Sequence, residues 1–411
     1  MARSLGLTAY RALARKGDLS QEALDLPRPE GSLVWIHASE PGNLLAVHDL
    51  SKRLLLVIED LSVLITLPQS ALPAGGHVPQ PTDPRISQII LAGDHPATVS
   101  AFLDHWRPTL GIWVWGGLKP NLILEASDRG CPLFLIDADV DGLDRRQNRW
   151  LPDLTRQVLS QFSAVLARSE AGYRRLVGLG LSPYNVEQTS PLLAGGQVLG
   201  CDEGDLADLS GVMGGRPAWF ATNVLPREVP TVLAAHRQAS RLSHRLLLIL
   251  QPSQPGEGED AARHAADMGL HVSRWDNGDY PDEITQVLLA GDPAARGLFF
   301  RVAPLSFLGS TLVPGETAID PLDAAALGSA ILYGPKVRHF MPSYSRLAAA
   351  GAARIVNDAD ALGAAVTSLN APDHAAAMAH AGWDVISQGA ALTDKVIDLV
   401  QETLDARASR S

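Results

Sequence analysis

The sequence predicts an α/β protein with two similar halves, each built on a parallel β-sheet that helices cover on both faces. Three observations support this prediction. The chain has 411 residues, which is enough for two domains with separate hydrophobic cores. Short apolar runs alternate with helical patterns along the chain, as they do in proteins with parallel sheets. A Gly-rich, acidic stretch at 192–217 lies between the halves and is expected to link them.

Strands are expected in the short runs that are rich in apolar and β-branched residues. In the first half these runs are RLLLVIED (53–60), ISQIILAG (86–93), LGIWVWG (110–116), PLFLIDA (132–138) and SAVLARS (163–169). In the second half they are PAWFATN (217–223), HRLLLILQP (244–252), LHVSRW (270–275), GLFFRV (297–302), LSFLGS (305–310) and SAILYGP (329–335).

The runs and the Gly-rich stretch together define the expected domains. The N-terminal domain covers 1–195, a linker covers 196–216, and the C-terminal domain covers 217–390. The last segment, 391–411, is expected to form a helix that packs back on the N-terminal domain.

The bulk composition excludes several classes of protein. The net charge of −11 argues against a nucleic-acid surface and against broad adhesion to anionic lipid. The two cysteines, Cys131 and Cys201, form no zinc or redox spacing. No apolar run reaches the length of about 18–20 residues that spans a bilayer. Near the N-terminus, Leu7 and Tyr10 share a stripe with basic neighbours, which fits a helix docked on the core or one lying on a membrane surface.

One acidic segment is similar to the start of a calcium-binding loop. Asp137, Asp139 and Asp141 occupy its first, third and fifth positions, and Gly142 occupies the sixth. The segment also contains the Asp-x-Asp pattern of metal-dependent sugar transferases. However, the twelfth position of a calcium loop should be a bidentate Glu, and here it is Asn148. We therefore expect a solvated acidic turn and no metal site.

The second half contains the features of a nucleotide site. The strand Leu305–Leu308 ends in Gly309-Ser310-Thr311, and a helix is expected to begin at Asp320-Pro321. A second short strand, Ala330–Tyr333, ends in Gly334-Pro335. Free N–H groups at a helix start beside a glycine turn can bind phosphate, and a nearby carboxylate can bind ribose hydroxyls. These turns are therefore expected to converge on one pocket.

The first half has a comparable feature. The strand Leu33–Ile36 ends in a small polar turn that runs from His37 to Asn43. Because α/β proteins bind ligands where strands end in such turns, this turn is a candidate site.

These residues resemble those of the Kdo transferases (3-deoxy-D-manno-octulosonic acid transferases) of lipopolysaccharide synthesis. The run from Trp35 to Gly42 is similar to the family's WIHAVSVGE turn, and Pro120–Ile123 is similar to its WPNLI. RGCPLFLIDA (129–138) is similar to RGIPVLLVNA. In the second half, the matching segments follow the family's order: Val302–Leu308, Asp320–Asp323, Gly334-Pro335 and His339-Phe340. The resemblance is collinear over most of the chain.

The resemblance implies a GT-B fold, in which two Rossmann-like domains face an interdomain cleft. It also implies a glycosyltransferase that moves Kdo or a related sugar from CMP-Kdo to lipid A precursor, with inversion and without a metal. The CMP-sugar is then a co-substrate, and no cofactor is expected. The implied location is cytoplasmic, with peripheral contact to the inner-membrane face where the anionic glycolipid acceptor lies.

The resemblance places the catalytic base at Asn43, where the family has Glu. Asparagine cannot act as a base near neutral pH. Glu40 is the nearest carboxylate in the sequence and could replace the missing base. The alternative is that Glu40 only caps the following helix or faces solvent.

Other site positions of the family also differ here. The paired acceptor-side glutamates fall on Trp115 and Gly117, and Ser253 replaces the Arg that meets the donor phosphate. Ala295 stands where the family has a Glu beside the cytosine. The positions that the resemblance assigns to donor binding are Pro252, Ser253, Pro293, Ala294, Ala295, Thr311, Asp320, Pro321, Leu322, Asp323, Gly334 and Pro335.

Three interpretations follow. The first is a divergent transferase whose site has been rewritten. The second is a non-catalytic or repurposed GT-B paralogue that acts as a binding or regulatory subunit. The third is an unrelated two-domain α/β enzyme with a chance similarity. The pair Asn43 and Ser253 separates the first two, because the non-catalytic reading requires that nothing replaces either residue.

Overall fold

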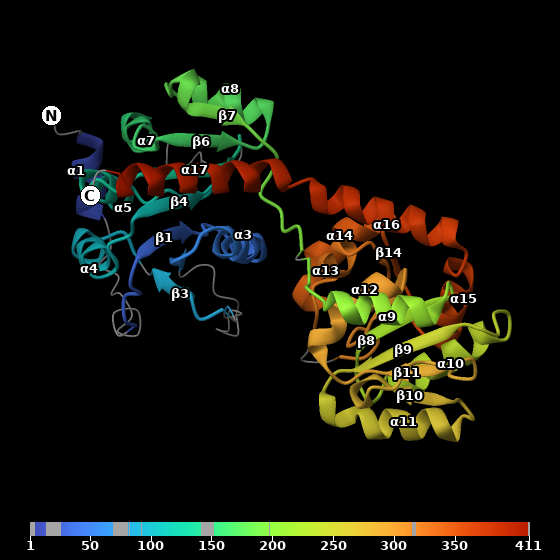
Figure 1. The fold of residues 1–411 in the computed structure, drawn as a ribbon. Coiled ribbons are helices and arrows are strands. Elements are labelled where there is room, and N and C mark those ends of the chain that lie inside the picture. Colours follow the sequence, from blue (N-terminus) through green and yellow to red (C-terminus); the bar gives the residue numbers. More distant parts are fainter. Residues whose placement is uncertain are drawn as a thin grey trace. The chain divides into compact units, whose positions relative to one another are not determined.

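The computed structural model describes residues 5–13, 26–68, 81, 83–91, 93–140, 152–196, 198–314 and 318–409. The chain forms two compact units, of which unit 1 comprises residues 1–194 and 388–411 and unit 2 comprises residues 195–387. Each unit contains a seven-stranded sheet with helices packed on it (Figure 1). All neighbouring strands run parallel. The predicted fold class is therefore confirmed.

The sheet of unit 1 has the order β3-β2-β1-β4-β5-β6-β7. Its strands are β1 (Ser32–His37), β2 (Leu61–Pro68), β3 (Ile86–Leu91), β4 (Leu110–Val114), β5 (Leu133–Ala138), β6 (Ala164–Ala167) and β7 (Val186–Gln188). The chain leaves β1 toward β2 and β3, and later returns to β4 on the other side of β1. This reversal makes the carboxyl ends of β1 and β4 the topological switch point, where α/β proteins bind ligands.

The helices of unit 1 are α1 (Leu5–Leu13), α3 (Leu44–Val57), α4 (Pro96–Trp106), α5 (Pro120–Asp128), α7 (Pro152–Leu159), α8 (Glu170–Gly178) and α17 (Ala390–Ala408). The core beneath them is rich in large aromatic side chains. Trp35 packs on Phe102 and Trp113, with ring centroids 5.4 and 6.0 Å apart. Burying each such side chain contributes about 1.5–3 kcal/mol to the stability of the unit.

Helix α1 packs against this core. Leu7 and Tyr10 pack against the core, and the Tyr10 hydroxyl donates a hydrogen bond to Asp94 over 2.9 Å. Burial and the adjacent Asp94 carboxylate raise the pKa of Tyr10, so the phenol stays protonated. This contact favours the docked helix over the membrane-surface alternative.

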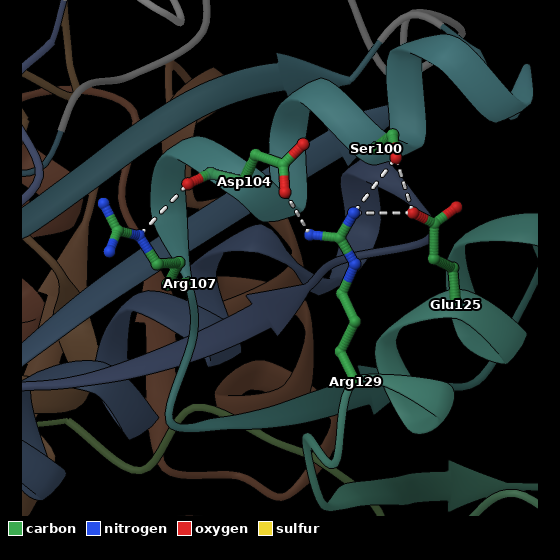
Figure 2. Close-up of polar contacts among 5 residues, drawn as sticks. All are labelled: Ser100, Asp104, Arg107, Glu125 and Arg129. Carbon is green, nitrogen blue, oxygen red and sulfur yellow. Dashed lines mark hydrogen bonds and ion pairs between the residues drawn. The ribbon is translucent and has the colours of Figure 1, made fainter.

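A polar cluster clamps α4 to α5 (Figure 2). The Arg129 guanidinium binds Asp104 over 2.8 Å, Glu125 over 2.7 Å and the Ser100 hydroxyl over 3.0 Å. Ser100 in turn donates to Glu125 over 2.7 Å, and Arg107 donates to the Asp104 carbonyl. Because α5 runs back from the carboxyl edge of the sheet, this cluster holds the end of α5 opposite the switch point.

Helix α17 returns to unit 1 after the whole of unit 2. At its start, the Leu392 N–H donates to the Ser190 hydroxyl over 3.0 Å, and Lys395 pairs with Glu187 over 3.0 Å. At its end, Arg407 donates to the Thr109 and Gly130 carbonyls. The last helix is therefore tied to unit 1 along its length (Figure 1).

The sheet of unit 2 has the order β10-β11-β9-β8-β12-β13-β14. Its strands are β8 (Ala218–Val224), β9 (Leu247–Pro252), β10 (Val272–Arg274), β11 (Val287–Leu289), β12 (Leu305–Leu308), β13 (Ala330–Tyr333) and β14 (Ala353–Ile355). Its helices are α9 (Glu203–Met213), α10 (Val229–Ser240), α11 (Gly258–Asp267), α12 (Arg296–Val302), α13 (Pro321–Ala326), α14 (Met341–Ala349), α15 (Ala359–Leu369) and α16 (Pro372–Ser387).

Helix α9 occupies much of the Gly-rich stretch between the halves. Asp202 caps its first turn by accepting the Asp205 N–H, and Gly214 ends it in the left-handed region. The chain before α9 passes so close to α12 that a Cβ on Gly297 would lie 2.1 Å from the Gly200 carbonyl. Gly297 is therefore required by this backbone approach.

Two of the expected strands are wrong, because both runs are helical. RLLLVIED continues α3, where Leu54 and Leu55 are buried but Leu56 and Val57 are exposed. GLFFRV forms α12, whose run from Gly297 to Phe300 is buried. Short apolar runs do not distinguish a buried helix from a buried strand, and tertiary packing decided both cases.

Among the described helices, none combines the length and the apolar character that crossing a bilayer requires.

Candidate functional site

The polar turn after β1 carries the position that the family uses for its base. A short 3-10 turn (Pro41–Asn43) leads directly into α3, and Asn43 is its N-cap residue. The Asn43 side chain is half-buried and makes no capping hydrogen bond. Glu40 is exposed, and its backbone carbonyl accepts the Asn43 N–H over 3.2 Å. Of these two residues, only Glu40 offers a carboxylate that a substrate can reach.

The turn after β4 packs tightly against the turn after β1. The Ser39 hydroxyl donates to the Val114 carbonyl over 2.7 Å. Gly116 has φ +147, and a Cβ there would lie 2.5 Å from Ser39 Cβ and 3.6 Å from Glu40 Cγ. The two turns that flank the switch point therefore form one continuous surface, and only glycine fits at 116.

The two acceptor-side positions in this turn differ in exposure. Trp115 is buried at 5 % exposure and belongs to the hydrophobic core, whereas Gly117 is exposed. Trp115 therefore supports the turn from below, and Gly117 presents backbone at the surface.

Beneath these turns lies a buried, neutral histidine. His37 stacks on Trp113 with ring centroids 4.0 Å apart, and its Nδ1 is 2.8 Å from the Thr66 hydroxyl. Burial, with a smaller effect from the Lys119 ammonium, lowers the pKa of His37 well below its ordinary value. His37 therefore carries no charge at neutral pH, and its packing on Trp113 and Thr66 supports the turns above it.

Asp137 is the most strained and perturbed carboxylate at this edge. It is the second-last residue of β5 and has φ +59, a left-handed conformation that residues other than glycine rarely adopt. Its Oδ1 accepts the Leu192 N–H over 2.9 Å, and its Oδ2 lies 3.8 Å from Arg168 Nη1. Burial raises the pKa of Asp137 to about 6, with further raising effects from Asp139 and Glu40.

The neighbouring Asp139 has a different role. It binds Arg168 Nε over 2.6 Å and the Ser169 hydroxyl over 2.8 Å. These bonds, together with a backbone hydrogen bond from Val140, outweigh the effect of burial and lower the pKa of Asp139. Asp141, Gly142 and Asn148 of the calcium-like pattern lie outside the described residues. Among the described residues, no three His, Cys, Asp or Glu side chains group as a metal site would require.

In unit 2, a buried carboxylate organises the glycine turn after β12. Glu228, which precedes α10, is 1 % exposed. Its carboxylate accepts the N–H groups of four consecutive residues, which are Ser310, Thr311, Leu312 and Val313, over 2.6–3.3 Å. It also accepts the Leu225 N–H over 3.1 Å. These N–H groups are therefore already occupied, and a phosphate near this turn must be held by other groups.

The same turn is locked to the end of β8. Asn223 has φ +56 and Ser310 has φ +59, and both are buried. Asn223 Nδ2 donates to the Ser310 hydroxyl over 3.1 Å, and that hydroxyl is 3.0 Å from the Asn223 carbonyl. The backbone strain of both residues is thus held in place by mutual hydrogen bonds.

The turns after β12 and β13 contact each other. The Gly334 N–H donates to the Thr311 hydroxyl over 2.7 Å, and the Lys336 N–H donates to the Thr311 carbonyl over 2.8 Å. A Cβ on Gly334 would lie 2.3 Å from that carbonyl, so glycine is required there. Gly334 is buried, whereas the adjacent Pro335 is exposed.

The helix predicted at Asp320 is α13. Asp320 caps it by accepting the Leu322 N–H over 3.0 Å, and Pro321 occupies the first turn. Pro321 and Leu322 are buried, while Asp320 and Asp323 are half-buried. The two carboxylates are therefore the groups of this segment that reach the surface.

The remaining donor positions lie at the ends of β9 and β11. Pro252 is buried, and the Ser253 hydroxyl donates to Glu257 over 2.6 Å. The segment Pro293–Ala295 is a 3-10 turn that Asp292 caps through the Ala294 N–H. These positions offer no positive charge.

A guanidinium that the sequence comparison did not select lies at this same edge. Arg296 begins α12 and is half-buried, and its Nε is 3.3 Å from Gln251 Oε1. Gln251 is fully buried and also binds the Thr222 hydroxyl over 2.7 Å. Burial lowers the pKa of Arg296, while Asp323 acts in the opposite direction. The polar Gln251 inside the apolar run LLLILQP was the sequence signal for this network.

Unit 2 also contains a cavity of about 680 Å³ near these turns. Its lining includes two aromatic rings, Trp275 and Tyr280, 5.6 Å apart and edge to face. The other lining residues are Asp205, Pro255, Asp276, Gly278, Gly291, Asp292 and Pro293. Aromatic faces beside carboxylates suit a flat ring that bears amino groups, and the acidic lining disfavours a phosphate.

The two Rossmann-like units place this chain in the GT-B class of glycosyltransferase folds. Comparison with known proteins finds similarity to the Kdo transferases. The sequence model of the 3-deoxy-D-manno-octulosonic-acid transferases (Kdo transferases) matches residues 11–192.

Whole relatives with that name match most of the chain. The transferase of Bordetella pertussis is 27% identical over 396 residues, covering 92% of this chain and 89% of its own. That of Haemophilus influenzae is 23% identical and covers 92% and 88%. The probable mitochondrial transferase of Arabidopsis thaliana is 26% identical and covers 76% and 71%. Among solved structures, MurG of Acinetobacter baumannii is 15% identical with a TM-score of 0.47, covering 90% of this chain and 100% of its own.

The chain is therefore similar to Kdo transferases over most of its length, at 23–27% identity.

Proposed function

We propose that the chain is a glycosyltransferase that moves Kdo, or a closely related sugar acid, from its CMP-activated form to a lipid A-type glycolipid. The observation that carries the proposal is the exposed Glu40 carboxylate at the switch point of unit 1, beside the family base position that Asn43 occupies. The near full-length similarity to Kdo transferases supports the substrate class.

In the proposed reaction, Glu40 acts as the general base. The acceptor hydroxyl oxygen forms a bond to the anomeric carbon while the bond from that carbon to the CMP phosphate oxygen breaks. The proton of the hydroxyl passes to Glu40, and CMP leaves with the electron pair of the broken bond. A positioned carboxylate contributes about 10²–10⁴ in rate to such a step. The Asn43 amide cannot contribute in this way.

On the donor side, Arg296 is the candidate for the phosphate contact that Ser253 lacks. It lies at the carboxyl edge of the sheet of unit 2, next to the turn Pro293–Ala295, and Gln251 orients its guanidinium. The cavity at Trp275 and Asp276 suits the amino-bearing cytosine ring. Asp320 and Asp323 are the candidate partners of the ribose hydroxyls. We expect transfer to proceed without a metal cofactor, which an assay in excess chelator tests.

Donor binding can be tested without turnover. We expect CMP to raise the thermal unfolding temperature of the full chain more than UDP or GDP at equal concentration. A ligand at 100 times its Kd stabilises the native state by about 2.7 kcal/mol. Equal effects of the three nucleotides, or none, would contradict the donor assignment.

The role of Glu40 as the base can be tested only by measuring the transfer reaction. Glu40→Gln should reduce transfer from CMP-Kdo by about 10²–10⁴ and leave the thermal effect of CMP unchanged. Glu59→Gln is the matched control, because Glu59 is also exposed but precedes β2, away from the switch point. Transfer that survives Glu40→Gln would overturn the role of Glu40. A chain that binds CMP but never transfers would favour the non-catalytic alternative.

A further inference from the structure

Lys119 holds an unusual position in unit 1. It lies between the turn after β4 and helix α5, for which it is the N-cap residue with φ −112 and ψ 91. Its side chain is half-buried and makes no capping hydrogen bond. The turn after β4 flanks the switch point, so Lys119 is placed at the carboxyl edge of the sheet.

The charge of Lys119 has no ion-pair partner in the described part of the chain. Its ammonium forms no hydrogen bond there, and Asp94 attracts it from beyond ion-pair distance. The Asp94 carboxylate is already engaged by the N–H groups of Asn121 and Leu122, each over 2.9 Å, and by the Tyr10 hydroxyl. The Asp94 carboxylate therefore binds the N–H groups at the start of α5 and forms no ion pair with Lys119.

The environment of Lys119 disfavours its charged form. Burial lowers its pKa, and Asp94 offsets only part of that effect. The other titratable group that senses the ammonium is His37, which is buried and neutral. A half-buried, unpaired ammonium reduces stability, and such costs are typical of positions that a ligand completes.

We propose that Lys119 binds an anionic oxygen of the substrate, a phosphate or a carboxylate, at the carboxyl edge of unit 1. The identity of the substrate rests on the proposed function, but the binding of an anion does not. Two sources have the same chemistry: the phosphate of the glycolipid acceptor and the carboxylate of the transferred sugar acid. Lysine suits both as a compact point charge.

The geometry around Lys119 fits this role. The Gly116-Gly117 turn precedes it, and the exposed Gly117 leaves the approach to the turn free of side chains. Glu40, which lies against Gly116, would then act on a hydroxyl of the same ligand that Lys119 holds by its anion. A cation that holds the anion of a ligand near the Glu40 carboxylate orients the ligand as well as attracting it.

The test compares the full-length wild type with Lys119→Met and Lys119→Arg by thermal unfolding and by titration. The probes are glucose 1-phosphate, a simple sugar phosphate, and free Kdo, a sugar acid. Without a ligand, Lys119→Met should unfold at a higher temperature than the wild type, because an uncompensated charge has been removed. It should bind the effective probe about ten- to hundred-fold more weakly, whereas Lys119→Arg should retain most of the binding.

Lys395→Met is the matched control, because Lys395 is half-buried like Lys119 but is paired with Glu187 over 3.0 Å. It should not unfold at a higher temperature and should bind both probes as the wild type does. A response to glucose 1-phosphate alone identifies the acceptor phosphate as the source, and a response to Kdo alone identifies the sugar carboxylate. No binding of either probe, or equal binding by Lys119→Met, overturns the proposal. Anion binding without any transfer from CMP-Kdo would instead refute the proposed function and leave this site standing.

Discussion

Replacing Asp137 by Asn should stabilise the chain above pH 6 and change its stability little near pH 4. The carboxylate is buried at the end of β5 in a left-handed conformation, and burial raises its pKa to about 6. Asn keeps an oxygen that can accept the Leu192 N–H, now 2.9 Å from Asp137 Oδ1, but it cannot ionise. The substitution therefore isolates the effect of the charge.

The sign follows from the two pKa values. The folded pKa lies above the unfolded value of about 3.9, so the folded state binds the proton more tightly. This stabilising contribution is complete below the unfolded pKa and is lost as the pH rises through about 6. A shift of roughly two units corresponds to about 3 kcal/mol. Because Arg168 lies 3.8 Å away and loses a partner in the variant, we expect a net gain of about 1–3 kcal/mol at pH 7.5.

The assay is urea unfolding of both proteins from pH 4 to pH 8, because the difference between them cancels the titration of all other groups. Asp139→Asn is the matched control of opposite sign. Hydrogen bonds hold the pKa of Asp139 low despite its burial, so its contribution exists above the unfolded pKa and the variant should lose stability at neutral pH. A pH-independent difference for Asp137→Asn, or a loss of stability at pH 8, would show that the charge of Asp137 does not destabilise the folded state.

Three further predictions concern other contacts. Glu228→Gln should lower the free energy of unfolding by about 3–5 kcal/mol, since an amide nitrogen would face backbone N–H donors that now bind a carboxylate; the exposed Glu283→Gln should change it little in the same urea titration. Arg129→Met should cost less than about 1 kcal/mol by thermal unfolding, because its ion pairs are partly exposed. Asn43→Glu in the Glu40→Gln background should restore only part of the transfer rate in a coupled CMP-release assay, since the other rewritten positions remain.

The alternation of apolar runs and helical patterns predicted the two parallel sheets, but the expected strands did not include β2, β7, β11 or β14. It also located the turns after β1, β12 and β13, because Gly, Pro and small polar residues mark the ends of strands. It failed at α3 and α12, where apolar residues are contiguous and only packing determines the conformation.

The candidate site was less predictable, because its properties arise from tertiary contacts. Glu228 precedes α10 in the sequence and looks like an ordinary helix-start carboxylate, yet four of the N–H groups that it binds are more than 80 residues away. In the sequence Asp137 stands out only as part of a calcium-like pattern, since neither its backbone strain nor its burial is visible there. Lys119 directly precedes the Pro-Asn pair that resembles the family, and nothing in the sequence marks the lysine itself as half-buried.

The most direct test of the central claim is acceptor-dependent release of CMP from CMP-Kdo by the purified full-length chain, with a lipid A precursor as acceptor and mass analysis of the product. If the chain transfers Kdo, CMP and a glycolipid heavier by one Kdo residue should form in equal amounts, at a rate that Glu40→Gln lowers by about 10²–10⁴. Absence of product at high enzyme concentration, under conditions where CMP still stabilises the native chain, would contradict that claim.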